Sequence, residues 1–136
     1  MQKVYLDSNL YISALNKDAL TEHIVALFEQ AEAGTLQIVS SVLVYGEVIK
    51  KSSTAVYGHT MQFLDVLPVT YTPLDKTVML LAAKLRLSHP ALKLPDAIHI
   101  ATALINNCEE LLSEDKQLTK IAKDYVPAGS VLTHVS

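Results

Sequence analysis

Short apolar runs alternate along the chain with longer stretches in which apolar residues recur at helical spacing. The runs are typical of buried strands and cover residues 4–6, 36–39, 69–72, 109–113 and 130–135. The helical repeats predict helices over 8–15, 20–33, 55–67, 74–87, 95–106 and 115–123. A further helix is expected after Ser40 or Ser41, with Val42, Tyr45, Val48 and Ile49 on its apolar side.

This alternation of strands and helices favours an α/β fold. We expect a three-layer α/β/α sandwich, doubly wound, with a mostly parallel central sheet of four to five strands. Gly34 is a natural helix end, Pro68 stops a helix, and Pro95 suits the first turn of one. The predicted helix over 74–87 keeps little polar surface, so it is either buried on two sides or part of a subunit interface.

Length and composition narrow the class of protein. With 136 residues and 50% apolar content, the chain is expected to form a single domain over 1–136. No apolar run is long enough to span a membrane, and the start does not have the apolar run of a signal peptide. The single cysteine, Cys108, excludes a disulfide framework and a thiolate metal site, which favours a cytoplasmic setting.

The net charge of −3 has the wrong sign for a protein that coats nucleic acid without specificity. Any contact with nucleic acid is therefore expected to be local. Candidate patches contain Lys50, Lys51, Lys84, Arg86, Lys93, Lys116, Lys120 and Lys123, although such residues also form ordinary solvated helix faces.

Four acidic residues stand where strands or helices begin or end. Asp7 and Asp115 follow strand-like runs, Asp96 lies at a helix start, and Glu47 projects from a helix side. Because the carboxyl ends of parallel strands meet at one edge of a sheet, we expect these carboxylates to converge. A cluster of Asp and Glu offers the oxygen ligands of a hard cation, so it predicts Mg²⁺ or Mn²⁺ and activation of water against a phosphodiester. The number of ions, one or two, stays open.

Each acid also has a purely structural alternative. Asp7 and Asp115 could cap the helices that follow them, because a carboxylate accepts hydrogen bonds from free backbone N–H groups at a helix start. Asp96 could complement the helix dipole, and acids such as Glu47 are ordinary on helix surfaces.

Three polar residues are candidates to support the acidic cluster. Asn9 and Ser113 lie beside Asp7 and Asp115 in sequence, with helix capping and a strand-end hydroxyl as their structural alternatives. His99 shares a helix face with Asp96, and could act as a general base or simply be a packed, hydrogen-bonded histidine. Tyrosines such as Tyr5 are treated as packing residues.

The same residues carry a family resemblance that covers essentially the whole chain. The motifs are VYLDSN at residues 4–9, Glu47 in the helix after the second strand, LPDAIHIATA at 94–103 and LLSEDK at 111–116. In their order and spacing they resemble the PIN-domain nucleases, and among these the small VapC-like toxins.

The resemblance implies a Mg²⁺- or Mn²⁺-dependent ribonuclease, usually a homodimer, that a small antitoxin protein inhibits. It also implies that Asp7, Glu47, Asp96 and Asp115 build the metal site and that Asn9 and Ser113 stand close to it. The neighbouring Glu114 leaves open which of two carboxylates, Glu114 or Asp115, faces the metal.

Other functions remain open at this point. A housekeeping RNA-processing nuclease fits the same motifs, as does an inactive module that kept the fold. A phosphatase on a similar sheet usually carries Asp-x-Asp where this chain has Asp7-Ser8-Asn9. A dinucleotide-binding enzyme is disfavoured, because the four glycines form no Gly-x-Gly-x-x-Gly loop.

Overall fold

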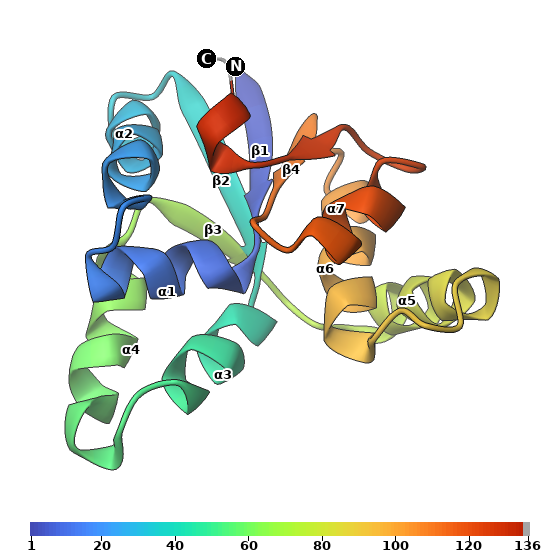
Figure 1. Cartoon of the computed structure of the whole chain (residues 1–136), viewed down its shortest axis with the longest axis horizontal. Coiled ribbons are helices and arrows are strands. Elements are labelled where there is room, and N and C mark those ends of the chain that lie inside the picture. Colours follow the sequence, from blue (N-terminus) through green and yellow to red (C-terminus); the bar gives the residue numbers. More distant parts are fainter. Residues whose placement is uncertain (135–136) are drawn as a thin grey trace.

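The structure, a computed structural model, describes residues 1–134, over which strands and helices alternate (Figure 1). The strands are β1 (Gln2–Leu6), β2 (Leu36–Ser41), β3 (Val69–Thr72), β4 (Glu110–Leu112) and β5 (Ala128–Gly129). The α-helices are α1 (Ser8–Asn16), α2 (Thr21–Glu32), α3 (Leu43–Lys50), α4 (Tyr57–Val66), α5 (Lys76–Ser88), α6 (Leu94–Ile105) and α7 (Lys116–Ala122). Two 3₁₀ helices, η1 (Thr54–Val56) and η2 (Val131–Thr133), complete the order.

The five strands form one parallel sheet in the order β3–β2–β1–β4–β5. The central strand β1 pairs with β2 through Val4 opposite Ile38 and with β4 through Leu6 opposite Leu112. The chain adds β2 and β3 on one side of β1 and then returns to add β4 and β5 on the other. This reversal is a topological switch point, where a parallel sheet leaves a crevice at the carboxyl ends of its strands.

Helices cover both faces of the sheet, which confirms the predicted α/β/α sandwich. Helices α1 to α4 pack on one face, and α5, α6 and α7 pack on the other (Figure 1). Because successive strand side chains point to opposite faces, Val4 and Leu6 of β1 enter the first core and Tyr5 enters the second. Leu111 and Leu112 of β4 divide between the cores in the same way.

Short polar side chains and one glycine set several helix ends. The carboxylates of Asp7, Asp75 and Asp115 accept hydrogen bonds from backbone N–H groups at the starts of α1, α5 and α7. Gly34 follows α2 with a φ of 80°, a conformation that glycine adopts without steric strain, so its predicted role as a helix stop is confirmed.

The predicted strand over 130–135 is wrong. The last strand is β5, Ala128–Gly129, and Val131–Thr133 form the 3₁₀ helix η2. Ser130 explains the difference, because its Oγ accepts a hydrogen bond from Leu132 N at 3.0 Å and thereby caps a turn. The alternation of apolar and polar residues over this segment therefore belongs to a helical turn and not to a strand. Val135 lies outside the described residues.

The helix predicted after Ser40 or Ser41 starts at Leu43, one or two residues later than the pattern indicated. Strand β2 continues through Ser41, whose Oγ accepts a hydrogen bond from Leu43 N at 3.1 Å. Val42 thus precedes the helix and is 43% exposed, whereas Val44 and Val48 are buried. The apolar side of α3 is rotated accordingly from the predicted one.

Helix α5 packs on α6 but is not buried on two sides. Val78, Ala82 and Leu85 lie in the core, whereas Leu80 is 60% exposed and Leu87 is 84% exposed. Of the two expectations for this apolar helix, burial on both sides is therefore wrong for the single chain. Within residues 1–134, no helix has both the length and the apolar character needed to cross a membrane.

Candidate functional site

The candidate site lies at the switch point, at the carboxyl ends of β1 and β4. Asp7 directly follows β1 and Ser113 directly follows β4. Asp7 N donates a hydrogen bond to Leu112 O at 3.0 Å, which holds the two strand ends side by side. Both Asp7 and Ser113 are buried, with 6% and 2% exposure. The parallel sheet thus brings together two residues that are far apart in sequence.

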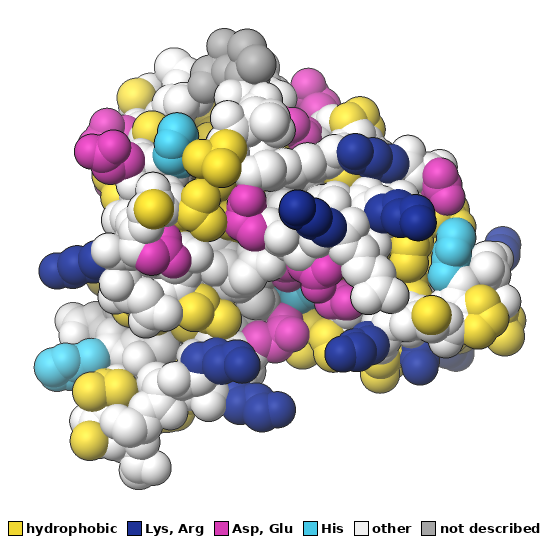
Figure 2. All heavy atoms as spheres, in the orientation of Figure 1, with side chains coloured by type: hydrophobic (Ala, Val, Ile, Leu, Met, Phe, Trp, Pro, Cys, Tyr) yellow, Lys and Arg dark blue, Asp and Glu magenta, His cyan; other side chains and the backbone are white. Residues whose placement is uncertain are grey.

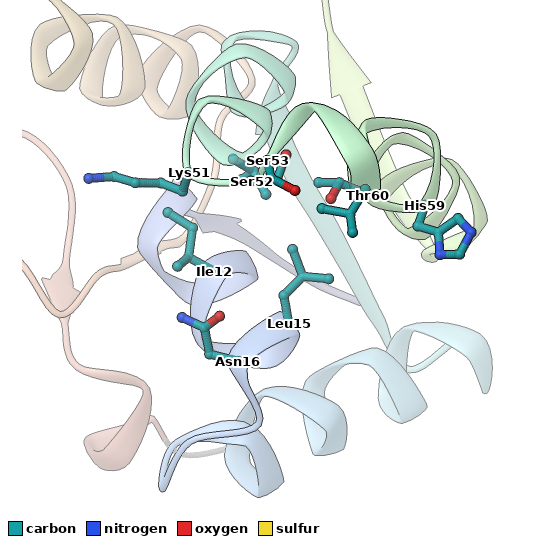
Figure 3. A pocket seen from close by; sticks show the side chains of 10 residues that line it. Ile12, Leu15, Asn16, Lys51, Ser52, Ser53, His59 and Thr60 are labelled. Atoms are coloured by element: carbon teal, nitrogen blue, oxygen red, sulfur yellow. The ribbon is translucent and has the colours of Figure 1, made fainter.

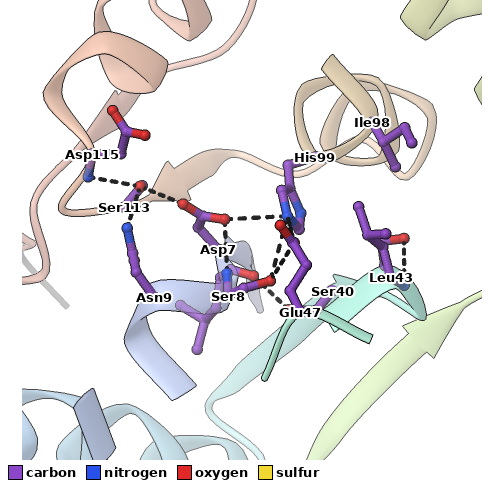
Figure 4. Close-up of polar contacts among 12 residues, drawn as sticks. Asp7, Ser8, Asn9, Ser40, Leu43, Glu47, Ile98, His99, Ser113 and Asp115 are labelled. Atoms are coloured by element: carbon purple, nitrogen blue, oxygen red, sulfur yellow. Dashed lines mark hydrogen bonds and ion pairs between the residues drawn. The ribbon is translucent and has the colours of Figure 1, made fainter. Parts of the chain in front are cut away.

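Ser113 organises one half of the site (Figure 4). Its Oγ donates to Asp7 Oδ2 at 2.6 Å and accepts from Asn9 Nδ2 at 3.2 Å and from Asp115 N at 3.0 Å. Because the single hydroxyl hydrogen goes to Asp7, Asn9 must present its amide nitrogen to Ser113. The other amide atom of that side chain, Asn9 Oδ1, is buried without a hydrogen-bond partner among the described residues.

Glu47 and His99 form the other half of the site. Glu47 projects from α3, where its Oε1 accepts hydrogen bonds from Ser8 Oγ at 2.7 Å and from His99 Nε2 at 2.6 Å. His99 Nε2 also lies 3.2 Å from Asp7 Oδ1, so the imidazole stands between two carboxylates (Figure 4). Ligand atoms of Asp7, Glu47 and His99 all lie within 4.8 Å of one another, the spacing of a metal-binding cluster.

Charges and burial act against each other on this pair. Burial alone would raise the pKa of Glu47, but the hydrogen bond and charge of His99 and the hydrogen bond from Ser8 bring it below its ordinary value. Burial alone would lower the pKa of His99, but Glu47, Asp7 and Asp96 raise it above its ordinary value. The site therefore favours the ionised form of the Glu47 carboxylate and the protonated form of the His99 ring beside it.

Asp96 differs from the other acids because no hydrogen bond or ion pair within the described chain engages its carboxylate. It lies in the first turn of α6 and is half-buried. Burial first, and then the negative charges of Asp7 and Asp115, raise the pKa of Asp96 to about 6. Asp96 is thus close enough to these two acids to feel their charge, although it lies outside the compact group of Asp7, Glu47 and His99.

Asp115 and Glu114 have different surroundings. Asp115 Oδ1 caps α7 by accepting hydrogen bonds from Gln117 N at 3.0 Å and Leu118 N at 3.2 Å. Both oxygens of Glu114 are engaged at the C-terminal segment, Oε1 by Ser130 Oγ at 2.6 Å and Oε2 by Val131 N at 2.8 Å. Of these two neighbouring acids, Asp115 is the one whose charge adds to burial in raising the pKa of Asp96, although its carboxylate lies outside the compact group of Asp7, Glu47 and His99.

The arrangement fits a hard divalent cation. Carboxylate oxygens of Asp7 and Glu47 lie close to each other and to His99, and within residues 1–134 neither the Asp96 carboxylate nor the buried Asn9 Oδ1 accepts a hydrogen bond. Such unpaired oxygens are unfavourable next to one another unless a cation or ordered water accompanies them. The residues that could hold the ion are Asp7, Glu47, Asp96 and Asp115, with Asn9 beside them.

Sequence reasoning missed two participants in this network. Tyr5 was treated as a packing residue, yet its Oη lies 2.5 Å from His99 Nδ1 and accepts a hydrogen bond from Ser41 N at 3.0 Å. The sequence assigns no role in the site to Ser8, yet its hydroxyl donates to Glu47. Both residues flank Asp7 in VYLDSN, but only the fold shows what they contact.

A separate cleft shares α1 and α3 with the site. It has a volume of about 410 Å³ and an apolar floor that includes Ile12, Leu15, Val48 and Val56 (Figure 3). Lys51 and His59 also line it, and none of the four acids does. The cleft is therefore a neighbour of the acidic cluster and not part of it.

Basic side chains surround the acids on the face shown in Figure 2. Lys93 immediately precedes α6, Lys116 is the first residue of α7, and Lys50 acts electrostatically on Glu47. All three lysines are exposed, and the ion pairs found within residues 1–134 involve histidine and not lysine or arginine. These cations are therefore available to an anionic ligand that approaches the cluster.

Comparison with known proteins places this geometry in a family. The family model of the PIN domain matches residues 4–124. A comparison with curated proteins gave no match.

Solved structures show the same fold. The structure of VapBC2 from Rickettsia felis, bound to a DNA fragment from its promoter, aligns with a TM-score of 0.73 and 16% identity, covering 95% of this chain and 98% of that chain. A toxin–antitoxin complex from Klebsiella pneumoniae aligns with a TM-score of 0.70 and 21% identity, over 94% of this chain and 97% of that one. FitAcB from Neisseria gonorrhoeae aligns with a TM-score of 0.70 and 16% identity, over 96% and 99%.

Proposed function

The chain belongs to the PIN domain family, and we propose that it is a metal-dependent endoribonuclease that hydrolyses RNA phosphodiester bonds, as the toxin of a toxin–antitoxin pair. The observation that carries this proposal is the group of Asp7, Glu47 and His99 at the switch point, whose ligand atoms lie within 4.8 Å of one another, with the half-buried Asp96 unpaired within residues 1–134. Burial, and then the charges of Asp7 and Asp115, raise the pKa of Asp96. An uncompensated group of carboxylates is unfavourable in the free protein and becomes favourable around a cation.

The proposed ligands are Asp7, Glu47, Asp96 and Asp115, and the proposed ion is Mg²⁺ or Mn²⁺. Oxygen donors without a thiolate suit these hard cations. When bound, such an ion lowers the pKa of a bound water and neutralises negative charge that develops on the phosphoryl oxygens. Asn9 and Ser113 would act beside the ligands, since Ser113 orients Asp7 Oδ2 and leaves Asn9 Oδ1 free to accept a hydrogen bond from water.

Local positive charge supports nucleic acid as the substrate in spite of the net charge of −3. Lys50, Lys93 and Lys116 each lie within three positions of an acid of the cluster and are exposed. Their ammonium groups could bind backbone phosphates on either side of the cleaved bond without contacting bases. RNA is proposed as the substrate because of the resemblance to VapC-like toxins.

Two protein partners belong to the proposal. An antitoxin is supported by the solved structures of similar fold, whose titles describe toxin–antitoxin complexes. A homodimer is supported by the exposed apolar surface of α5, where Leu80 and Leu87 are uncovered. Leu87 also lines a shallow cavity with Met79, Ala83, Arg86, Pro90 and Leu94, and a second copy of the chain would shield this mainly apolar surface from water.

Cleavage of labelled RNA tests the proposed activity. We expect purified protein to cut RNA with Mg²⁺ or Mn²⁺ and to stop with EDTA, and we expect Asp7→Asn and Asp96→Asn to reduce the rate at least about 10²-fold. Glu32→Gln, an exposed acid on α2, is the matched control and should cut normally. Unchanged cleavage in both site variants would refute the assignment.

The same assay separates the alternative functions. If the protein cuts DNA of the same sequence faster than RNA, the substrate is DNA and not RNA. If it hydrolyses a phosphate monoester faster than it cuts RNA, a phosphatase is favoured. No cleavage, together with no calorimetric binding of Mn²⁺, would indicate an inactive interaction module. Growth arrest when the chain is expressed alone, and its loss in Asp7→Asn, separates a toxin from a housekeeping nuclease.

A further inference from the structure

His99 occupies an ambiguous position in the acidic cluster. It is completely buried on α6, and its Nε2 lies 2.6 Å from Glu47 Oε1 and 3.2 Å from Asp7 Oδ1. These distances suit two different roles. The ring could bind the cation through Nε2, or it could donate a hydrogen bond from Nε2 to the carboxylates that bind the cation.

The position of one hydrogen atom decides between these roles. A histidine nitrogen that binds a metal carries no hydrogen, so the other ring nitrogen must carry it and needs an acceptor. In this structure the partner of the other nitrogen, Nδ1, is Tyr5 Oη at 2.5 Å. The role of His99 therefore depends on whether Tyr5 donates or accepts.

Tyr5 is set as the donor by the strand beside it. Its Oη already accepts a hydrogen bond from the backbone N–H of Ser41 at 3.0 Å. The hydroxyl hydrogen of Tyr5 then needs an acceptor, because the side chain is fully buried, and His99 Nδ1 is the acceptor that the described contacts provide.

With Nδ1 as the acceptor, a neutral His99 carries its hydrogen on Nε2. A doubly protonated ring carries one there too, and its Nδ1–H would then donate to Tyr5 Oη, so Tyr5 selects the hydrogen position in the neutral ring, whereas Nε2 is a donor in both charge states. Its hydrogen bond ends on Glu47 Oε1, where the Ser8 hydroxyl also donates at 2.7 Å. Both donors reach Oε1, and no hydrogen bond within residues 1–134 engages Glu47 Oε2.

We propose that His99 is a positioning residue, locked by Tyr5 and Ser41 so that its Nε2–H fixes the carboxylates of Glu47 and Asp7, and that it is not a metal ligand. This inference rests on the proposed function, because it assumes that the cluster binds a cation. The cation would then meet oxygen atoms only, a donor set that favours Mg²⁺ or Mn²⁺, whereas an added imidazole nitrogen would favour zinc and its neighbours.

Pulsed electron paramagnetic resonance of the Mn²⁺-loaded protein tests the inference without any measurement of activity. We expect no ¹⁴N coupling of the strength that a directly bound imidazole gives. A strong ¹⁴N coupling that disappears in His99→Gln would overturn the inference, because it would identify His99 as a ligand. His23→Gln, an exposed histidine on α2, is the control and should leave the spectrum unchanged.

Calorimetry with Mn²⁺ on three variants gives a second readout. His99→Leu, which removes the donor, should weaken binding about 10- to 100-fold, as loss of a residue that orients a ligand does. His99→Gln keeps an amide N–H near the position of Nε2 and should recover most of the affinity. Equal loss in both variants, with circular dichroism showing that both are folded, would contradict a role as donor.

Tyr5→Phe keeps the ring of His99 and removes only the hydroxyl that sets its hydrogen. We expect this variant to bind Zn²⁺ more tightly relative to Mn²⁺ than the wild type does, because a water molecule in the space of the hydroxyl can accept a hydrogen from Nδ1, which leaves Nε2 free to act as a ligand. An unchanged Zn²⁺/Mn²⁺ ratio would overturn the proposed lock. If the wild type binds neither ion, the proposed function fails, whereas binding with a ¹⁴N signal defeats only the positioning role.

Discussion

Replacing Asp96 with asparagine should stabilise the metal-free protein while abolishing its activity. Asn has nearly the same shape as Asp, and the carboxylate of Asp96 has no hydrogen-bond donor in the described structure to lose. The change removes one negative charge that burial and the charges of Asp7 and Asp115 make unfavourable. Stability and activity should therefore change in opposite directions, which a simple loss of folding could not produce.

The magnitude follows from the pKa of Asp96, which rises from 3.8 to about 6 in the folded protein. A difference of this size corresponds to about 3 kcal/mol of destabilisation when the carboxyl is fully ionised. Solvent screening at a half-buried side chain reduces this to about 1–2 kcal/mol. For a chain of this length, that corresponds to an increase in Tm of about 3–6 °C in the variant.

The pH dependence has a definite sign. Because the folded state binds the proton of Asp96 more tightly than the unfolded state, the wild type loses stability as the pH rises from about 4 to about 6. Well below its ordinary pKa of 3.8, the carboxyl is protonated in both states, so the Tm values of wild type and Asp96→Asn should converge as the pH falls toward about 3. The stabilisation of the variant should therefore be nearly absent at about pH 3 and complete at about pH 7.5.

Thermal unfolding followed by circular dichroism, with EDTA present, measures this difference directly. Added Mn²⁺ at 100 times its Kd should stabilise the wild type by about 2.7 kcal/mol, and it should leave a variant that no longer binds the ion unchanged, which would reverse their order. Glu32→Gln serves as the control, because it removes an exposed charge on α2 away from the cluster. The reasoning fails if Asp96→Asn melts at or below the wild-type temperature at about pH 7.5 without metal.

Three further predictions concern other parts of the molecule. Ser113→Ala should lower activity about 10- to 100-fold and stability by about 1–2 kcal/mol, measured by RNA cleavage and denaturant unfolding, because it leaves Asp7 Oδ2 without its donor. Asp115→Asn should keep the cap of α7 and the wild-type Tm but lose activity, whereas Asp115→Ala should lose activity and also about 1 kcal/mol of stability. Equal Tm values for the two variants would contradict the capping role. Leu87→Glu should convert a homodimer into monomers, because it places a charge on the exposed apolar surface of α5, and light scattering would measure the mass. RNA cleavage by the variant would be measured in parallel. A variant that stays dimeric would place the interface elsewhere.

The sequence alone was sufficient for the class of fold. Strand-like runs and helical repeats are local patterns, and the alternation of the two predicted a parallel sheet between layers of helices. The sequence pattern gave wrong element boundaries where a local side-chain hydrogen bond changed the path of the backbone. Ser130 turns the chain into η2 where the pattern indicated a strand, and Ser41 delays the start of α3. A single hydroxyl can override a weak periodicity over a few residues.

The sequence also identified the four acids, because their positions at strand and helix ends follow from the same patterns. Whether they share one site stays part of the proposal, but the fold does bring Asp7, Asp96 and Asp115 within electrostatic reach of one another. It also separates Glu114 from them, since Ser130 and Val131 engage its carboxylate. Two adjacent acids in a sequence look equivalent until the chain direction around them is known.

Only the tertiary structure decided what surrounds the acids. Tyr5 and His99 are 94 positions apart in sequence, and their hydrogen bond exists because β1 and α6 pack against each other inside one core. The sheet register adds Ser41 N, which sets Tyr5 as a donor. Periodicity reports which face of an element is apolar, but the atom that a side chain meets across the core depends on how whole elements pack.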